Sequence, residues 1–310
     1  LSRLNKFFSE ESLAGYIIRG AGLAVFWRVL GFVGGYALSI MISNRLGASA
    51  FGMYSVFLSL LALASIPAKL GLDRALIRLL AEKSPLGKLR YDPSSLLKKA
   101  YLIAFLPICL SALTLFLLAP IIATEIYDNA LLAPVIRTAA IATIPFAYLM
   151  IGSESFRGIG KAGAYSFTQH GLRQLLPLSL LAIVFIFPVS YKADLLAPRV
   201  FLIGITLASL FTFYHLFRQA KIYSQGEGIM PPKARELVRL AVPMMLAASA
   251  LVISSTADTL MLRFFESDAT VRKCHAAIKL AAVISFSIAS INTLAGPQFS
   301  RFYHSGALKQ

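Results

Sequence analysis

The stretch AYLIAFLPICLSALTLFLLAPIIA, residues 100–123, carries no charged residue along its whole length. About 20 apolar residues in a helix are enough to cross about 30 Å of membrane hydrocarbon. Seven further stretches of this kind accompany it: 21–43, 51–71, 131–152, 163–187, 199–218, 238–262 and 274–298. The sequence therefore predicts an all-α fold, a polytopic transmembrane helix bundle with eight spans.

The loops between these stretches alternate between basic and nearly uncharged. The second loop holds seven cations, Arg74, Arg78, Lys83, Lys88, Arg90, Lys98 and Lys99, whereas the segment 124–130 holds none. Because basic loops resist translocation, the rich side is predicted to be cytoplasmic. This places a multi-pass chain in the cytoplasmic (inner) membrane with its N-terminus inside.

The overall composition agrees with this topology. The chain has 310 residues, of which 57% are hydrophobic and 14% charged, with a net charge of +16. On a soluble protein that charge would suggest a nucleic-acid partner. Here the cations lie in short loops, where topology and contact with anionic membrane lipids account for them, so no nucleic acid is predicted.

Motifs for catalysis and for metal binding are missing from the sequence. Cys109 and Cys274 fall in or beside predicted spans, and the four histidines are scattered, so no metal-ligand spacing arises. There is also no glycine-rich phosphate loop and no nucleophile elbow. We therefore predict a non-enzymatic protein without cofactor, metal or catalytic residues.

The segment 219–233, with QGEG and MPP, is the most linker-like part of the chain. Beyond it the opening pattern of span lengths returns at an offset of 220 residues, which indicates an internal duplication of the kind common in transporters. We predict an N-terminal six-helix transmembrane lobe over 1–220, a cytoplasmic linker over 221–236 and the first two helices of a C-terminal lobe over 237–310. A full second lobe would need six spans, so we expect a parent protein of about twelve spans; a self-contained eight-span protein is the alternative.

Three stretches resemble a known family. Residues 45–82, RLGASAFGMYSVFLSLLALASIPAKLGLDRALIRLLAE, are similar to the signature of the polysaccharide-transporter, O-antigen flippase-like branch of the multidrug/oligosaccharidyl-lipid/polysaccharide (MOP) exporter superfamily. Residues 156–169, FRGIGKAGAYSFTQ, resemble the cytoplasmic turn between helices four and five, and the region from 240 onward resembles helices seven and eight. The matching positions are Leu46–Gly47, Phe51–Gly52–Met53–Tyr54, Gly71–Leu72–Asp73, Arg78 and Ala81–Glu82.

This resemblance implies a function and its partners. A member would flip a polyisoprenoid-pyrophosphate-linked glycan, a lipid-linked oligosaccharide or polysaccharide precursor, across the cytoplasmic membrane by alternating access. It implies contact with membrane lipids, an H⁺ or Na⁺ coupling ion, and glycan polymerase or ligase partners. Two features depart from the family pattern: the second copy has Val271–Cys274 where Gly-x-Tyr is usual, and helices nine to twelve are absent.

Ionisable residues inside the spans are the candidates for substrate binding. An anionic headgroup cannot enter hydrocarbon, so a flippase needs a hydrated, cation-lined path. Arg28, Lys279 and Arg173 lie inside or at the ends of spans, and an Arg fork suits phosphate. Snorkelling of these side chains to the interface is the alternative for each.

The remaining candidates are acidic residues and their basic neighbours. Asp258 could bind the coupling ion, or form an ion pair at the lobe interface. Glu154 and Arg157 could form a cytoplasmic gate or an ordinary surface pair. Asp73, Arg74 and Arg78 could steer substrate entry, or serve the helix that follows span two; Arg74 and Arg78 share one face of that helix.

Three other functions stay open. A multidrug or cation exporter of the same superfamily would use acidic cavity residues, which are scarce here. A membrane glycosyltransferase or polymerase would need clustered carboxylates, and the outside loops offer only scattered ones. A non-transporting truncated fragment is the third.

Overall fold

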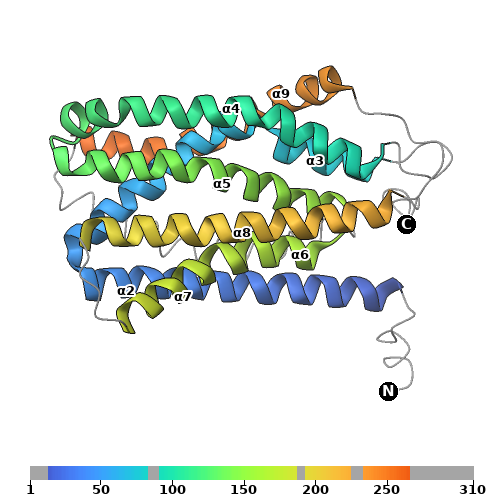
Figure 1. The fold of residues 1–310 in the computed structure, drawn as a ribbon, viewed down its shortest axis with the longest axis horizontal. Coiled ribbons are helices and arrows are strands. Elements are labelled where there is room, and N and C mark those ends of the chain that lie inside the picture. Colours follow the sequence, from blue (N-terminus) through green and yellow to red (C-terminus); the bar gives the residue numbers. More distant parts are fainter. Residues whose placement is uncertain (1–12, 83–90, 187–192, 225–232, 266–310) are drawn as a thin grey trace. The chain divides into compact units, whose positions relative to one another are not determined.

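The computed structural model describes residues 13–82, 91–186, 193–224 and 233–265, and every long element among them is helical (Figure 1). Six helical segments are long and apolar enough to cross a membrane. They are Gly22–Gly47, Ser49–Lys69, Pro93–Ile126, Ala130–Gly158, Ala162–Ile186 and Asp194–Ile222. They correspond to the first six predicted spans. This confirms an all-α membrane helix bundle.

The first two spans form a single long element, α2 (Leu13–Lys69), broken at Gly47. Gly47 has φ 90° and ψ 170°, a conformation that L side chains rarely adopt, and the chain reverses direction there (Figure 1). The sequence predicted a loop over 44–50. The structure replaces most of that loop with helix, because one glycine is enough to make the turn.

The second span ends at Lys69, two residues before the predicted boundary. Leu70 and Gly71 both have positive φ, 50° and 75°, and a separate helix α3 (Leu72–Ala81) follows. The sequence pattern is compatible with one continuous run from span two into this helix. A left-handed residue cannot continue an α-helix, so the chain turns before α3 begins.

The third and fourth spans form a hairpin. Helix α4 (Pro93–Ile121) begins at Asp92, whose side chain accepts a hydrogen bond from the Ser95 amide at 2.9 Å, and it continues through the π-helical segment η1 (Ile122–Ile126). The short 3₁₀ segment η2 (Ala130–Leu132) then leads into α5 (Ala133–Gly158).

The fifth span is interrupted by a π-helical segment. It consists of α6 (Ala162–Ser166), η3 (Phe167–Leu172) and α7 (Arg173–Ile186). The sixth span is α8 (Ala193–Tyr223). Helix α9 (Ala234–Phe265) coincides with the seventh predicted span, and the eighth falls outside the described residues.

The chain divides into two compact units, and residues 26–249 form the one that contains all the side chains discussed below. In this unit α5 occupies the middle, in contact with α3, α4 and α8. Two apolar clusters hold it together. The first core includes Phe57, Leu149, Phe201 and Ala208, and the second core includes Leu76, Ile151, Leu216 and Ala241.

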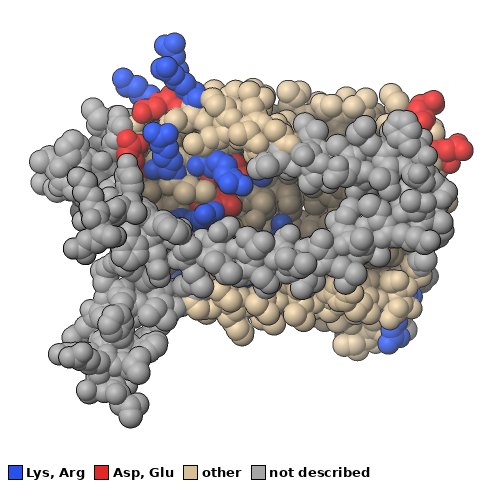
Figure 2. Space-filling view, turned by 180° about the vertical axis from the view of Figure 1, so that it is seen from behind, with Lys and Arg blue, Asp and Glu red and all other residues tan. Residues whose placement is uncertain are grey.

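The outside of the unit fits a lipid environment. Helix α4 exposes Leu102, Leu106 and Leu110, each more than 60% accessible and four residues apart. Charged side chains gather toward the ends of the described part, with a largely uncharged band between them (Figure 2). Such a surface would be an aggregation hazard in water and is the normal exterior of a membrane bundle.

Candidate functional site

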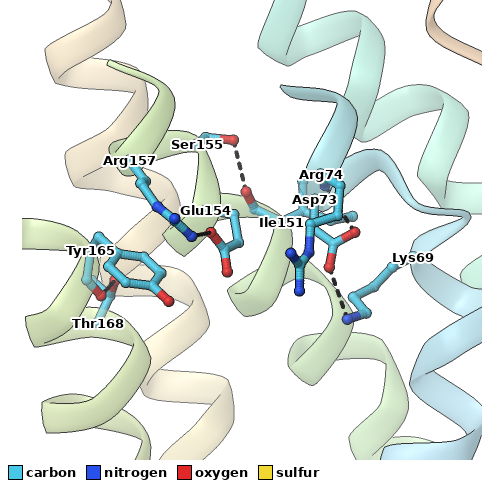
Figure 3. Close-up of polar contacts among 9 residues, drawn as sticks. All are labelled: Lys69, Asp73, Arg74, Ile151, Glu154, Ser155, Arg157, Tyr165 and Thr168. Atoms are coloured by element: carbon cyan, nitrogen blue, oxygen red, sulfur yellow. Dashed lines mark hydrogen bonds and ion pairs between the residues drawn. The ribbon is translucent and has the colours of Figure 1, made fainter. Parts of the chain in front are cut away.

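A buried carboxylate marks the end of the fourth span. The Glu154 side chain is only 8% exposed, and its Oε2 lies 3.5 Å from Nη1 of Arg157, which is 52% exposed. Arg74, from α3, also lies close enough to Glu154 to interact electrostatically. Figure 3 shows the carboxylate between the two guanidinium groups. One acid thus faces two cations that come from different helices.

Tyr165 joins this group from the start of the fifth span. The guanidinium carbon of Arg157 stands 5.6 Å from the centre of the Tyr165 ring, a cation–π contact. The Tyr165 hydroxyl also lies within electrostatic reach of Glu154, Arg28 and Arg74. We call these five residues, Arg28, Arg74, Glu154, Arg157 and Tyr165, the Tyr165 cluster.

Arg28 reaches the cluster because α2 approaches the π-helical segment η3 very closely. A Cβ built on Gly31 would lie 2.3 Å from the backbone oxygen of His170, so only glycine fits there. On the preceding turn, the Trp27 ring packs on Phe167 with 4.6 Å between centroids. Gly34 and Gly35 likewise allow close packing, because a Cβ added there would lie 2.6 Å from Leu175 and 3.2 Å from Gln174.

Arg173 lies immediately after η3 and adds another cation further into the fifth span than Tyr165. It interacts electrostatically with Tyr165, with Tyr54 of the second span and with His170. Arg28 also acts on His170. The two arginines that the sequence selected for headgroup binding therefore both act on one histidine.

Asp73 has a different environment from Glu154. Its Oδ2 accepts a hydrogen bond from Lys69 Nζ at 2.9 Å, and its Oδ1 accepts one from the Arg74 amide at 3.0 Å. These contacts join the end of α2 to the start of α3. Arg78 shares the exposed face of α3 with Arg74, as the sequence predicted.

Two candidates from the sequence cannot be placed. Lys279 lies outside the described residues, and Asp258 falls in α9 where side chains are not described. Within the described part, no group of three His, Cys, Asp or Glu side chains could hold a metal ion.

Sequence reasoning missed Tyr165 and Lys69. Tyr165 belongs to the quoted stretch 156–169, four residues after Lys161, but an isolated tyrosine at the end of a span is typical of an interface anchor. Lys69 falls within the predicted second span. Its role depends on the turn at Gly71, and the helical spacing of the sequence alone does not reveal that turn.

The fold and the site define a class: a multi-pass helical membrane protein with the architecture of MOP-superfamily transporters. A solved structure of an outward-facing multidrug resistance MATE family transporter of the MOP superfamily matches with a TM-score of 0.64 at 17% sequence identity. The match covers 90% of this chain and 62% of that transporter, and at this identity it speaks for the fold alone. No curated protein matches the chain significantly.

The family assignment is more specific. A family model described as polysaccharide biosynthesis protein matches residues 17–303. The chain belongs to this family. The resemblance drawn from residues 45–82 and 156–169 is thereby confirmed.

Proposed function

We propose that this chain acts in a membrane transporter that flips lipid-linked oligosaccharide or polysaccharide precursors across the cytoplasmic membrane. The observation that carries the proposal is the Tyr165 cluster, in which three arginines from α2, α3 and α5 surround one tyrosine and one buried acid. A pyrophosphate carries several negative charges and accepts bidentate hydrogen bonds from guanidinium groups. Family membership supports the same class of cargo.

The cluster suggests how a headgroup could be exchanged. At rest, Glu154 balances Arg157 and Arg74. An incoming pyrophosphate would compete with Glu154 for these two arginines. Arg28 of α2 and Arg173 of α7 would provide further contacts to it. The lobes 1–220 and 237–310, joined by 221–236, would then rock to expose the headgroup on the other side, driven by an H⁺ or Na⁺ gradient.

Surface charge supports one orientation of the chain in the membrane. Exposed cations gather at the same end of α3, α4, α5, α8 and α9 as the cluster, whereas the acids there are drawn into contacts, such as Glu236 with Tyr91. These exposed cations are Arg74, Arg78, Lys98, Arg157, Arg218, Lys221, Lys233, Arg235 and Arg239. By the positive-inside rule this end would face the cytoplasm, with the N-terminus inside.

Trp27 offers a direct binding assay, because it is the chain's single tryptophan and packs beside the cluster. A polyisoprenyl pyrophosphate without sugar would be titrated into the chain in nanodiscs while Trp27 emission is followed. We expect a saturable change, with Arg28→Gln weakening affinity about tenfold or more, the value of one charge-assisted hydrogen bond.

Arg137→Gln is the matched control. It removes the same charge from an arginine that is exposed and lies 5.4 Å from the Phe116 ring. It is 17 positions before Glu154 on α5, or about 25 Å along the helix. Equal weakening by both variants, or no saturable signal from the parent chain, would contradict a headgroup site at the cluster.

One observation favours a second candidate function. The buried Glu154 carboxylate could attract an organic cation, and the structural match is to a multidrug resistance transporter. If the chain is a cation exporter, a fluorescent organic cation should bind and Glu154→Gln should abolish its binding. The flippase proposal predicts that Glu154→Gln instead strengthens pyrophosphate binding, because the competing carboxylate is gone.

A further inference from the structure

A layer of polar side chains lies where the first core and the second core meet. It consists of Ser153 on α5, Gln169 on η3 and Thr212 on α8. One helical turn to one side of these residues stand members of the first core or side chains packed on it, namely Leu149, Leu172 and Ala208. One turn to the other side stand the corresponding residues of the second core, Phe156, Tyr165 and Leu216.

Contacts of the residues next to them place Ser153, Gln169 and Thr212 at about the same height along the helix bundle. A Cβ on Gly152, next to Ser153, would lie 2.8 Å from Cγ2 of Thr212. The ring of Phe211, next to Thr212, meets the ring of Phe167 edge-on with 5.8 Å between centroids. Phe167 is two residues before Gln169, and α5, α8 and η3 all pack on one another.

Each residue of the layer has a polar atom that finds no hydrogen-bond partner within the described part of the chain. These atoms are Ser153 Oγ, Gln169 Oε1 and Thr212 Oγ1, and the residues are 0%, 8% and 0% exposed. Other hydroxyls of α5 do bond to their own helix: Ser155 Oγ donates to the Ile151 carbonyl at 2.7 Å. An unsatisfied buried polar group costs about 1–3 kcal/mol, so three at one level call for a polar guest.

We propose that this layer is a binding site for ordered water. A buried water typically makes about three hydrogen bonds to polar groups that would otherwise be unsatisfied. The chemistry here matches: two hydroxyls can donate to a water oxygen, and the water can donate to the Gln169 carbonyl oxygen. A metal cation fits less well, because the three oxygens are neutral and the guanidinium-bearing Arg173 follows η3 directly.

The sign of one substitution separates a hydrated layer from a dry one. Thr212→Val replaces the hydroxyl by a methyl group of similar volume. In a hydrated layer it removes a partner of the water, and the midpoint of thermal unfolding falls by about 2 °C. In a dry layer it removes an unsatisfied group, and the midpoint rises. Thr212→Ser, which keeps the hydroxyl, is the control, and its unfolding midpoint should fall less than that of Thr212→Val.

Two further measurements test the shared guest, and neither depends on the proposed transport function. If Ser153 and Thr212 bind the same water, the effects of Ser153→Ala and Thr212→Val on the unfolding midpoint will not add, whereas simple additivity would overturn the proposal. The unfolding midpoint should be the same in sodium chloride and choline chloride. If the unfolding midpoint is higher in sodium chloride and this difference disappears in Gln169→Leu, the site binds a cation and not water.

Discussion

Two turns in this molecule each combine a left-handed glycine with an ion pair, yet they differ in packing. At the end of α2, Gly71 lies between Lys69 and Asp73, which are only 16% and 10% exposed and 2.9 Å apart. At the end of α5, Gly160 follows Arg157, which is 52% exposed and 3.5 Å from Glu154. At the first turn, which we call the closed joint, both members of the ion pair are nearly buried. At the second turn the acid is buried but the cation paired with it is accessible.

The difference would matter for the proposed function, because an ion pair can exchange partners only if one member is accessible. The Lys69–Asp73 pair is enclosed, and it joins two helices. In the proposed function, the Glu154–Arg157 pair would open toward an incoming anion with little loss of packing, because Arg157 is half exposed. The first turn should therefore control stability and the second should control binding.

The largest expected effect is on the glycine of the closed joint. Gly71→Ala would place a Cβ 2.2 Å from the Ala241 carbonyl oxygen at φ 75°, and the backbone of α9 cannot move aside cheaply. We expect a loss of more than about 3 kcal/mol in free energy of unfolding, measured by thermal unfolding in detergent.

Gly160→Ala is the matched control for that substitution. Gly160 has φ 83°, but a Cβ added there would meet no atom within 4 Å beyond its immediate chain neighbours. Only the left-handed backbone cost of about 1–2 kcal/mol remains. Equal losses at the two glycines would show that the crowding at Gly71 has no energetic weight.

The next effect concerns the enclosed ion pair. Asp73→Ala leaves the Lys69 ammonium group without its carboxylate in a nearly buried position. Breaking such a pair by removing one partner typically costs about 3 kcal/mol or more. The unfolding midpoint of the variant should fall well below that of the parent chain. Rescue by the double variant Lys69→Met/Asp73→Ala would confirm that the unpaired charge is the cause.

Arg157→Gln should affect binding more than stability. Because Arg157 is half exposed and the buried Glu154 keeps Arg74 as a second cation, we expect a loss of only about 0–1 kcal/mol in the free energy of unfolding. The affinity for a polyisoprenyl pyrophosphate, read from Trp27 emission, should nevertheless fall about tenfold. A large drop in the unfolding midpoint with unchanged affinity would reverse the roles of the two turns.

The smallest effect belongs to a carboxylate outside the spans. Burial tends to raise the pKa of Asp92, but hydrogen bonds donated by Ser224 and by Ser95 outweigh burial and hold that pKa below its usual value. A lowered pKa in the folded state means that Asp92 stabilises the chain at neutral pH, and that this contribution is lost as pH falls through the folded pKa.

The corresponding variant is Asp92→Ala, which removes the N-cap of α4. At pH 7 we expect a loss of about 1 kcal/mol. The gap between the unfolding midpoints of parent and variant should narrow below about pH 4, where the carboxyl group begins to protonate. A gap that stays constant down to about pH 2, below the usual range of an aspartate, would mean that the charge of Asp92 contributes nothing.

Much of the fold could be predicted, because membrane spans are a property of composition. Residues 100–123 are predicted to be a helix in lipid whatever surrounds them, because an uninterrupted apolar run of this length is too long for a membrane strand and satisfies its own backbone hydrogen bonds only as a helix. The prediction for Arg28 came from its depth in a span, where charge is costly, and the prediction for Glu154 came from its place beside Arg157 at the cytoplasmic end of the fourth span. The turn at Gly71 was missed because helical spacing continues across it, and only close packing against Ala241 and Met245 reveals why the chain bends there.

Composition and local motifs are enough to predict the first six spans, their order and the family, because both are properties of short stretches of sequence. The tertiary structure alone decided that Arg28, Arg74 and Arg157 meet at Tyr165, since these residues come from four different elements. It also decided the polar layer of Ser153, Gln169 and Thr212. These residues come from three different helical segments, and only helix packing brings their three unsatisfied atoms to one level.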